Sequence, residues 1–389
     1  MQSRRDFLAL GATGAIALGA PLPILWQRAM AEGKAGPDQP VLVVLELNGG
    51  NDGLNTVIPF TDDIYHRSRP TLRVEPAKVL KLDSQLGLHP AMTAFRRLWD
   101  QGLLKVVQNV GYPNPNRSHF RSMQIWQAGA VGPAPTAGWL GRASDAQPQF
   151  GSCFVGEDAV PFALQARRTV PSALASLSDY KPVANLAGVS VGDSNGDLLL
   201  KQIEERFQST MKLAQRLDQA AVSIPPAAPG TLADRLRTIR VLLEKAPEHR
   251  LFYTSLGGFD THIGQSFAHS DLLKTVADST EKFLKDLRDS QLDERVVVLV
   301  YSEFGRRLQE NGSGGTDHGT SAPLFLAGKR IEGGILGTPP NLADLELGDP
   351  KFKIDYRDVY ATLLRRWLKI DPTPILGSRD DSLPLCTKA

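Results

Sequence analysis

Apolar runs alternate with amphipathic stretches along most of the chain, which is the pattern of an α/β protein. Five apolar runs predict strands, at 41–45, 103–110, 250–255, 295–301 and 323–327. Apolar residues at helical spacing predict helices at 90–101, 120–127, 232–245, 266–290 and 355–370. The run 41–45 is continuously apolar, as in a strand covered on both faces. The sequence therefore predicts a mainly parallel central sheet with helices on both faces.

The middle of the chain has a different composition. Residues 128–180 are rich in Gly, Pro and Ala, 198–219 have helical periodicity, and 223–230 form a Pro-rich turn or linker. The predicted strands on the two sides of this region fit one sheet. We therefore interpret 32–389 as one α/β domain and 128–248 as an insertion or cap on it.

The N-terminus has the features of an export signal. Arg4 and Arg5 form a twin-arginine pair, a weakly apolar stretch follows at 9–25, and residues 29–31 offer a small-x-small cleavage site. We predict that 1–31 is a signal peptide read by the twin-arginine translocase, and that the mature protein is periplasmic or extracellular. The alternative is an uncleaved N-terminal anchor.

The charge balance narrows the classes of partner. The chain has 44 Lys and Arg against 42 Asp and Glu, and loss of 1–31 removes three arginines and one aspartate, which leaves a balanced mature chain. A balanced chain argues against nucleic acid or an anionic membrane as a partner. No later segment is long and apolar enough to span a bilayer, so we expect no membrane association after signal cleavage.

Cys153 and Cys386 are the only cysteines. An oxidising compartment permits a disulfide between them, and two free thiols are the alternative. The sequence has no Cys-x-x-Cys, which excludes iron–sulfur and Cys-rich zinc sites.

Polar clusters rich in carboxylates and imidazoles stand at the ends of predicted strands and in the loops between them. There are five, at 48–53, 116–119, 257–262, 302–306 and 315–319. Carboxylates and imidazoles are ligands that divalent cations prefer. Sites in open α/β sheets form in the crevice at the carboxyl ends of the strands. The clusters therefore predict a metal site at that edge.

The first two clusters have structural as well as chemical interpretations. Asp52, in a glycine-rich loop, is a candidate metal ligand or the cap of a tight turn. Ser118 precedes a predicted helix, where serine is a common cap and where a nucleophile gains from the helix dipole. His119 beside it is a candidate base or a second capping residue.

The other clusters supply a second group of candidates. Asp260 and His262 form an Asp-x-His pair suited to zinc or manganese, with a surface loop as the alternative. Glu303 follows the most apolar strand, where a buried carboxylate needs a metal or a cation such as Arg306 as its partner. Asp317 and His318, in the fifth cluster, follow a flexible glycine-rich loop and offer two further ligands or a salt bridge.

Three stretches carry a resemblance to a known family. They are Leu45-Glu-Leu-Asn-Gly-Gly-Asn-Asp-Gly, Ser302-Glu-Phe-Gly-Arg and Gly315-Thr-Asp-His-Gly. The chain resembles the twin-arginine-exported bacterial family of domain of unknown function 1501, within the alkaline phosphatase and sulfatase superfamily. The resemblance implies an alkaline-phosphatase-like three-layer sandwich and a site with one or two metals.

The resemblance also implies roles for individual residues. Ser118 matches the nucleophile in position, and the implied metal ligands are Asp52, Asp260, His262, Glu303 and His318. Phe304 stands where the superfamily has a histidine, so the second metal site lacks a ligand. A second register uses Asp317 and His318 as the Asp-His pair, but it needs another histidine downstream, and none follows His318.

The implied activity is a periplasmic, metal-dependent hydrolysis of phosphate or sulfate esters. Zinc, manganese or calcium would lower the pKa of Ser118, with His119 beside it, and Arg117, Arg121 or Arg306 would pair with the anionic oxygens of the ester. The substrate would be a small-molecule or polymer-borne anionic ester. The alternative is a catalytically inactive sulfatase-like protein with a binding or assembly role at the cell envelope.

Overall fold

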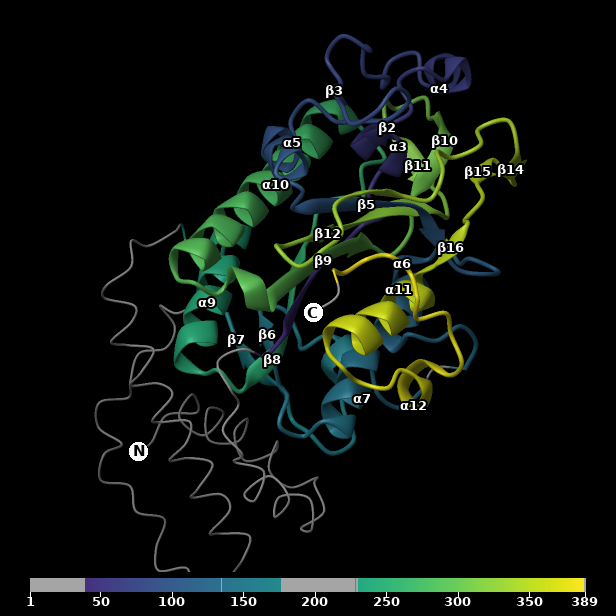
Figure 1. Ribbon diagram of the computed structural model, residues 1–389. Helices are drawn as coiled ribbons and strands as arrows, with labels where there is room; N and C mark the ends of the chain where they lie inside the picture. Colours follow the sequence, from purple (N-terminus) through teal and green to yellow (C-terminus); the bar gives the residue numbers. More distant parts are fainter. Residues whose placement is uncertain (1–38, 134, 176–227, 229, 388–389) are drawn as a thin grey trace, which may run out of the picture.

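A nine-stranded sheet forms the centre of the molecule. The computed structural model describes residues 39–133, 135–175, 228 and 230–387, which are coloured in Figure 1. Helices pack on both faces of the sheet, so the described part of the chain has three layers (Figure 1). This confirms the predicted α/β class with its three-layer sandwich.

Most neighbouring strands in the sheet are not consecutive in the chain, so crossover connections join them. From one edge to the other it is β13 (Gly334–Leu336), β5 (Leu104–Gly111), β12 (Ala322–Ala327), β9 (Val296–Ser302), β1 (Val41–Leu47), β8 (His249–Leu256), β6 (Gly151–Val155) and β7 (Ser172–Leu174). β16 (Ile354–Asp355) pairs with β5. β12 is antiparallel to both of its neighbours, and the other pairings in this sheet are parallel. The prediction of a mainly parallel sheet is confirmed.

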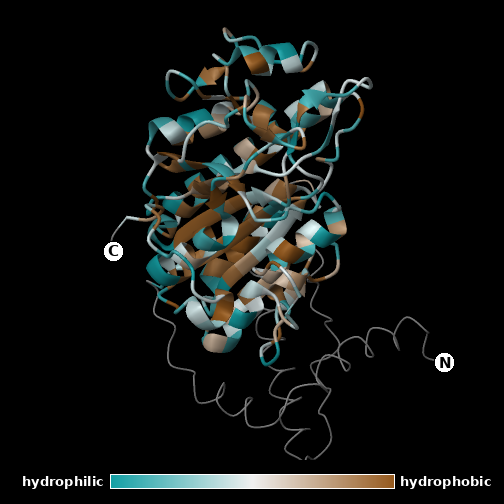
Figure 2. Ribbon diagram, turned by 90° about the vertical axis from the view of Figure 1, so that its right-hand side faces the viewer, coloured by the Kyte–Doolittle hydropathy of each residue, from teal (hydrophilic) through white to brown (hydrophobic). Residues whose placement is uncertain are grey.

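The packing of strand β1 on both faces explains why residues 41–45 are continuously apolar. All seven of its residues are buried, and alternate side chains enter two different cores. Val41, Val43 and Leu45 face one core, whereas Leu42 and Val44 face the other. The sheet is therefore covered on both faces at this strand, and Figure 2 shows its strands as the most hydrophobic part of the ribbon.

Each face of the sheet carries its own helical layer (Figure 1). One layer consists of α5 (Thr93–Asp100), α9 (Leu232–Lys245) and α10 (Gln265–Asp289). The other consists of α6 (His119–Ala128), α7 (Trp139–Ala146), α11 (Tyr356–Thr362), the π-helix η4 (Leu363–Trp367) and α12 (Thr373–Leu376). Aromatic stacking joins this layer to the sheet through Trp126 of α6 and Tyr301 of β9, whose ring centroids are 4.8 Å apart. Within the layer, Trp139 of α7 stacks on Tyr360 of α11 at 4.1 Å.

The region predicted as an insertion contributes to the main sheet where it is described. Its strands β6 and β7 extend the sheet beyond β8, and its helix α9 packs against α10. Residues 176–227, with the predicted helix 198–219, lie outside the described residues, as does the predicted signal peptide 1–31. A cap over 128–248 and the export signal both stay predictions.

Small elements surround the carboxyl ends of the central strands. They are α3 (Gly53–Thr56), β2 (Val57–Ile58), α4 (Asp63–Ser68), β3 (Leu80–Lys81), β4 (Gly87–Leu88), the hairpin β10 (Arg306–Glu310) with β11 (Thr316–His318), and the hairpin β14 (Leu345–Glu346) with β15 (Asp349–Pro350). Two 3₁₀ turns complete the described elements, η1 (Phe162–Leu164) and η3 (Asp293–Arg295).

The two cysteines are free thiols, and both are buried. Of the two states that the sequence left open, the structure therefore has the free one. Among the described residues, no helix combines the length and the apolar character that crossing a membrane requires.

Candidate metal centre

Three adjacent parallel strands bring distant polar clusters together. β1 lies between β8 and β9, and Leu47 near its end is level with Leu256 of β8 and Ser302 of β9. The loops that follow these strands therefore leave the sheet at the same edge. They carry the glycine-rich loop after β1, the Asp260 loop after β8 and Glu303 after β9.

Two glycines allow these loops to touch. Gly49 has φ +120°, and a Cβ there would lie 2.3 Å from the backbone nitrogen of Asp260. Gly50 has φ +70°, and its Cβ would lie 2.2 Å from the ring of Phe304. Any larger residue would push the loops apart, so the glycines are required by the close approach of backbone and ring.

Three side chains from different elements converge beside these loops. His119 is the first residue of α6, Asp260 follows β8, and His318 ends β11. One ligand atom from each lies within 4.8 Å of the other two. His119 Nε2 is 3.0 Å from His318 Nε2, and Asp260 Oδ1 is 3.4 Å and 3.1 Å from these two nitrogens. This nitrogen and oxygen set is one that zinc and related divalent ions use.

His262 extends the group. Its Nε2 lies 2.9 Å from His318 Nε2 and 3.0 Å from Asp260 Oδ1. The cluster therefore offers three imidazoles and one carboxylate. It brings together the predicted ligands Asp260, His262 and His318, and adds His119, which the sequence marked only as a base or cap.

The other nitrogen of each ring is held by an acceptor. His119 Nδ1 lies 2.7 Å from Glu303 Oε1, and His318 Nδ1 lies 2.8 Å from the carbonyl oxygen of Arg117. His262 Nδ1 lies 3.3 Å from Asp317 Oδ1. Because a carbonyl and an ionised carboxylate only accept, each Nδ1 donates its proton, so the neutral form of each ring keeps a lone pair on Nε2. Three such lone pairs converging on one carboxylate oxygen form a site that fits a cation.

The pKa shifts of Asp260 and His318 agree with this arrangement, whereas that of His119 opposes it. Burial would raise the pKa of Asp260, but the hydrogen bond and the charge of Arg306 outweigh it and lower that pKa to about 2. Burial lowers the pKa of His318. The hydrogen bond to Glu303 raises the pKa of His119, against the opposing effect of burial. At neutral pH the cluster therefore contains an ionised carboxylate beside a neutral imidazole.

Glu303 lies behind His119. It is fully buried, and its Oε1 accepts from the backbone N–H of Gly49 at 2.9 Å as well as from His119. Its Oε2 accepts from Ser302 Oγ at 2.9 Å. Both carboxylate oxygens are thus occupied by donors of the protein. Glu303 is therefore the acceptor that orients His119, and it is not one of the converging ligand residues.

Asp52 lies apart from the cluster. It is fully buried and forms a 2.6 Å ion pair with Arg69. Gln265 also donates to its carboxylate, and Asp52 caps α3 through the backbone N–H of Asn55. Burial would raise the pKa of Asp52, but the charge and hydrogen bond of Arg69 reverse the effect and lower it. The sequence considered a cap role for Asp52, and the structure has it in that role.

Arg306 joins the loops from within. Its guanidinium is fully buried and donates to Asp260 Oδ1 at 2.6 Å and to the carbonyl oxygens of Gly50, Thr316, Phe259 and Gly49. The N–H groups of Arg306 therefore all point to acceptors of the protein. The side chain therefore fixes Asp260 and the surrounding backbone, and it has no donor directed to solvent that would bind an ester.

Ser118 and Phe304 border the cluster. Ser118 is exposed at the N-terminus of α6, next to His119, and its hydroxyl makes no capping hydrogen bond. Phe304 is buried, with its ring centroid 4.9 Å from that of His119 and 5.0 Å from that of His318. Phe304 thus forms an apolar wall for two of the imidazoles, which explains a phenylalanine in this polar stretch.

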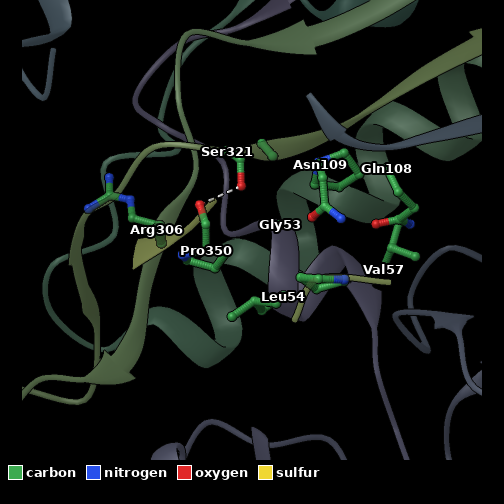
Figure 3. A pocket seen from close by; sticks show the side chains of 11 residues that line it. Gly53, Leu54, Val57, Gln108, Asn109, Arg306, Ser321 and Pro350 are labelled. Atoms are coloured by element: carbon green, nitrogen blue, oxygen red, sulfur yellow. Dashed lines mark hydrogen bonds between the residues drawn. The ribbon is translucent and has the colours of Figure 1, made fainter. Parts of the chain in front are cut away.

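A small pocket lies on the other side of Arg306 (Figure 3). It is bordered by Leu54, Gln108, Ser321 and Pro350, and Ser321 donates to the carbonyl oxygen of Pro350 across it. Its lining contains none of the clustered histidines. The candidate centre is therefore the solvent-facing cluster around Asp260, and this pocket is a packing feature beside it.

Comparison with known protein families identifies the family of this chain. A family model described as Protein of unknown function (DUF1501) matches residues 39–382. The chain belongs to the DUF1501 family. This confirms the family resemblance seen in the sequence, and no curated protein matched the DUF1501 chain.

Solved structures similar to this DUF1501 protein come from several bacteria. One is a protein in the alkaline phosphatase superfamily from Vibrio parahaemolyticus, with TM-score 0.44, 9% identity, and coverage of 99% of this chain and 80% of that one. Another is the lipoteichoic acid synthase LtaP from Listeria monocytogenes, with TM-score 0.40, 10% identity and coverage of 97% and 82%. A third is the C-terminal periplasmic domain of EcEptC from Escherichia coli in complex with Zn, with TM-score 0.39, 11% identity and coverage of 89% and 85%.

Proposed function

We propose that this protein is a metal-dependent hydrolase of phosphate or sulfate esters with one divalent cation. His119, Asp260 and His318 would hold the cation, with His262 as a fourth ligand. The observation that carries the proposal is the convergence of these ligand atoms while each Nδ1 is fixed by an acceptor. The imidazole donors favour zinc, the carboxylate also suits manganese, and calcium prefers a set made of oxygen ligands.

The cation would act as a Lewis acid that stabilises negative charge on the ester oxygens. The chain's own residues prepare the site for it. Arg306 holds Asp260 in place, Glu303 orients His119, and the carbonyl of Arg117 orients His318. Fixed donors of this kind need little rearrangement when a ligand arrives.

Ser118 is the nucleophile in this proposal. Its hydroxyl is exposed, is not used as a helix cap, and stands at the N-terminus of α6, where backbone N–H groups favour negative charge. Ser118 Oγ would displace the alcohol from the ester while its proton leaves with the alcohol. Water would then release the phosphate or sulfate group from Ser118 and restore the hydroxyl.

Metal analysis of purified protein tests the ligand set. We expect about one zinc or manganese ion per chain after loading, and loss of that ion in His318→Ala and Asp260→Asn. His66→Ala is the matched control, because His66 hydrogen-bonds the Phe60 carbonyl and lies outside the cluster. A wild-type protein that binds no ion, or an equal loss in the control, would contradict the proposed centre.

Ser118→Ala tests the nucleophile. We expect loss of turnover on a panel of aryl phosphates and sulfates with the bound metal unchanged. Turnover that survives in Ser118→Ala would show that Ser118 is not the attacking group.

A binding or assembly protein at the cell envelope is the second candidate. The observation in its favour is that two buried arginines already have partners in the protein. Arg306 donates to backbone carbonyl oxygens, and Arg69 forms an ion pair with Asp52. Neither arginine is then available to bind an anionic substrate. Stoichiometric metal together with no turnover on the ester panel would support this candidate.

A further inference from the structure

Several exposed large apolar side chains lie on segments that carry the candidate ligands or are linked to them. Among the described residues, those with the greatest exposure are Phe120 (86%), Phe267 (86%), Ile263 (77%), Leu347 (77%) and Val170 (38%). The first four belong to segments that build the centre or contact it. Exposed apolar side chains that cluster in this way mark binding sites more often than scattered ones do.

Three of the four are joined to the ligands by short segments of chain. Phe120 follows His119 in the first turn of α6, and Ile263 follows His262. Phe267 is in the first turn of α10, which begins at Gln265. His119 Nε2 and His262 Nε2 both lie within 3.0 Å of His318 Nε2, so the backbone segments that carry Phe120 and Ile263 come together at the centre.

Leu347 reaches the centre through polar contacts. It lies between β14 and β15 with φ +53°, a backbone conformation that is unfavourable for leucine. Arg307 donates to its carbonyl oxygen at 2.9 Å, and Asp349 accepts from Arg117 Nε at 2.9 Å. The carbonyl of Arg117 in turn holds His318. A strained and exposed leucine on a hairpin tied to the centre suits a contact residue.

We infer that the substrate of this centre is amphiphilic, an ester with a small anionic group and a long hydrocarbon chain. This inference rests on the proposed hydrolase function. The polar centre would take the anionic group, and the apolar rim, defined as Phe120, Ile263, Phe267 and Leu347, would contact the hydrocarbon. Phe120 and Ile263 are bonded directly to the ligand residues His119 and His262, so a hydrocarbon attached to a group at the centre would be within reach of the rim.

A series of straight-chain alkyl phosphates tests the inference. Binding of methyl, butyl, hexyl and octyl phosphate to the zinc-loaded full chain is measured by calorimetry, below their micelle concentrations. We expect the wild-type Kd to fall about two- to fourfold for each methylene that contacts the rim. In the triple variant Phe120→Ser, Ile263→Ser, Phe267→Ser, we expect this dependence on chain length to disappear.

Controls separate the inference from the proposed function. Val170→Ser removes an exposed apolar side chain outside the rim and should keep the wild-type dependence. A wild-type Kd that does not change with chain length, or a triple variant that keeps the dependence, overturns the inference. Failure to load zinc contradicts the proposed metal centre instead. A wild-type dimer that the triple variant lacks would show that the rim binds a second copy, which also overturns it.

Discussion

Glu46 on the central strand gives a prediction about stability and pH. Its side chain is buried on the face of the sheet that α6 covers. There it accepts from Gln127 Nε2 at 3.0 Å and from the hydroxyl of Tyr301 at 3.1 Å. No cation is among these partners. Burial, reinforced by the charge of Glu303, raises the pKa of Glu46 from 4.5 to about 7, although the hydrogen bonds oppose the change.

The sign of the effect follows from the two protonation states. The unfolded chain releases the Glu46 proton near pH 4.5, whereas the folded chain keeps it to about pH 7. Between these values the folded state binds more protons, so the stabilising effect of that proton is lost as pH rises. The difference corresponds to about 3 kcal/mol of unfolding free energy. Above pH 7 the contribution no longer changes.

Glu46→Gln removes the titration and keeps an oxygen that accepts from Gln127 and Tyr301. We expect the unfolding free energy of the variant, relative to wild type, to increase by up to about 3 kcal/mol between pH 4.5 and pH 8. Guanidinium denaturation of metal-free protein across this range measures it. Glu75→Gln, at an exposed position, is the matched control and should show no such trend. A constant difference between Glu46→Gln and wild type would refute the reasoning.

Arg69→Met leaves the buried carboxylate of Asp52 without its cation, and we expect denaturation to show a loss of about 3–5 kcal/mol; a loss below 1 kcal/mol would mean that water reaches the carboxylate. Gly50→Ala places a Cβ 2.2 Å from the ring of Phe304. We expect it to cost about 1–3 kcal/mol and to weaken zinc binding, and unchanged values would show that the loop adapts. Arg4→Lys with Arg5→Lys should leave precursor in the cytoplasm on cell fractionation, and normal delivery would show that another export route operates.

The fold could be predicted to a large extent because its strands are apolar on both faces. The continuous run at 41–45 became β1 with every residue buried, and the run 232–245 became α9 with the same bounds. The pairing of strands could not be predicted in the same way. β12 is antiparallel between β9 and β5, and an apolar strand carries no local signal for its direction.

The candidate site could be predicted in position but not in the roles of its residues. Asp260, His262 and His318 do meet, as expected for loops at one edge of a sheet. The role of His119 depends on Glu303, which is 184 residues away in sequence and fixes its Nδ1. No local pattern near His119 announces that contact. Asp52 likewise has a partner, Arg69, that only the folded chain reveals.

In this site, burial distinguishes the carboxylate that could bind a metal from the carboxylates that only hold other residues in place. Glu303 and Asp52 are both fully buried, and each has its carboxylate oxygens occupied by protein donors. Asp260 is exposed, and its Oδ1 lies among three imidazole nitrogens. Since a carboxylate next to a strand end can turn inward or outward, the sequence cannot separate these cases. The partners in the folded chain do so, because the backbone N–H of Gly49 and the Ser302 hydroxyl hold Glu303 inside the protein, whereas Asp260 meets the imidazoles at the surface.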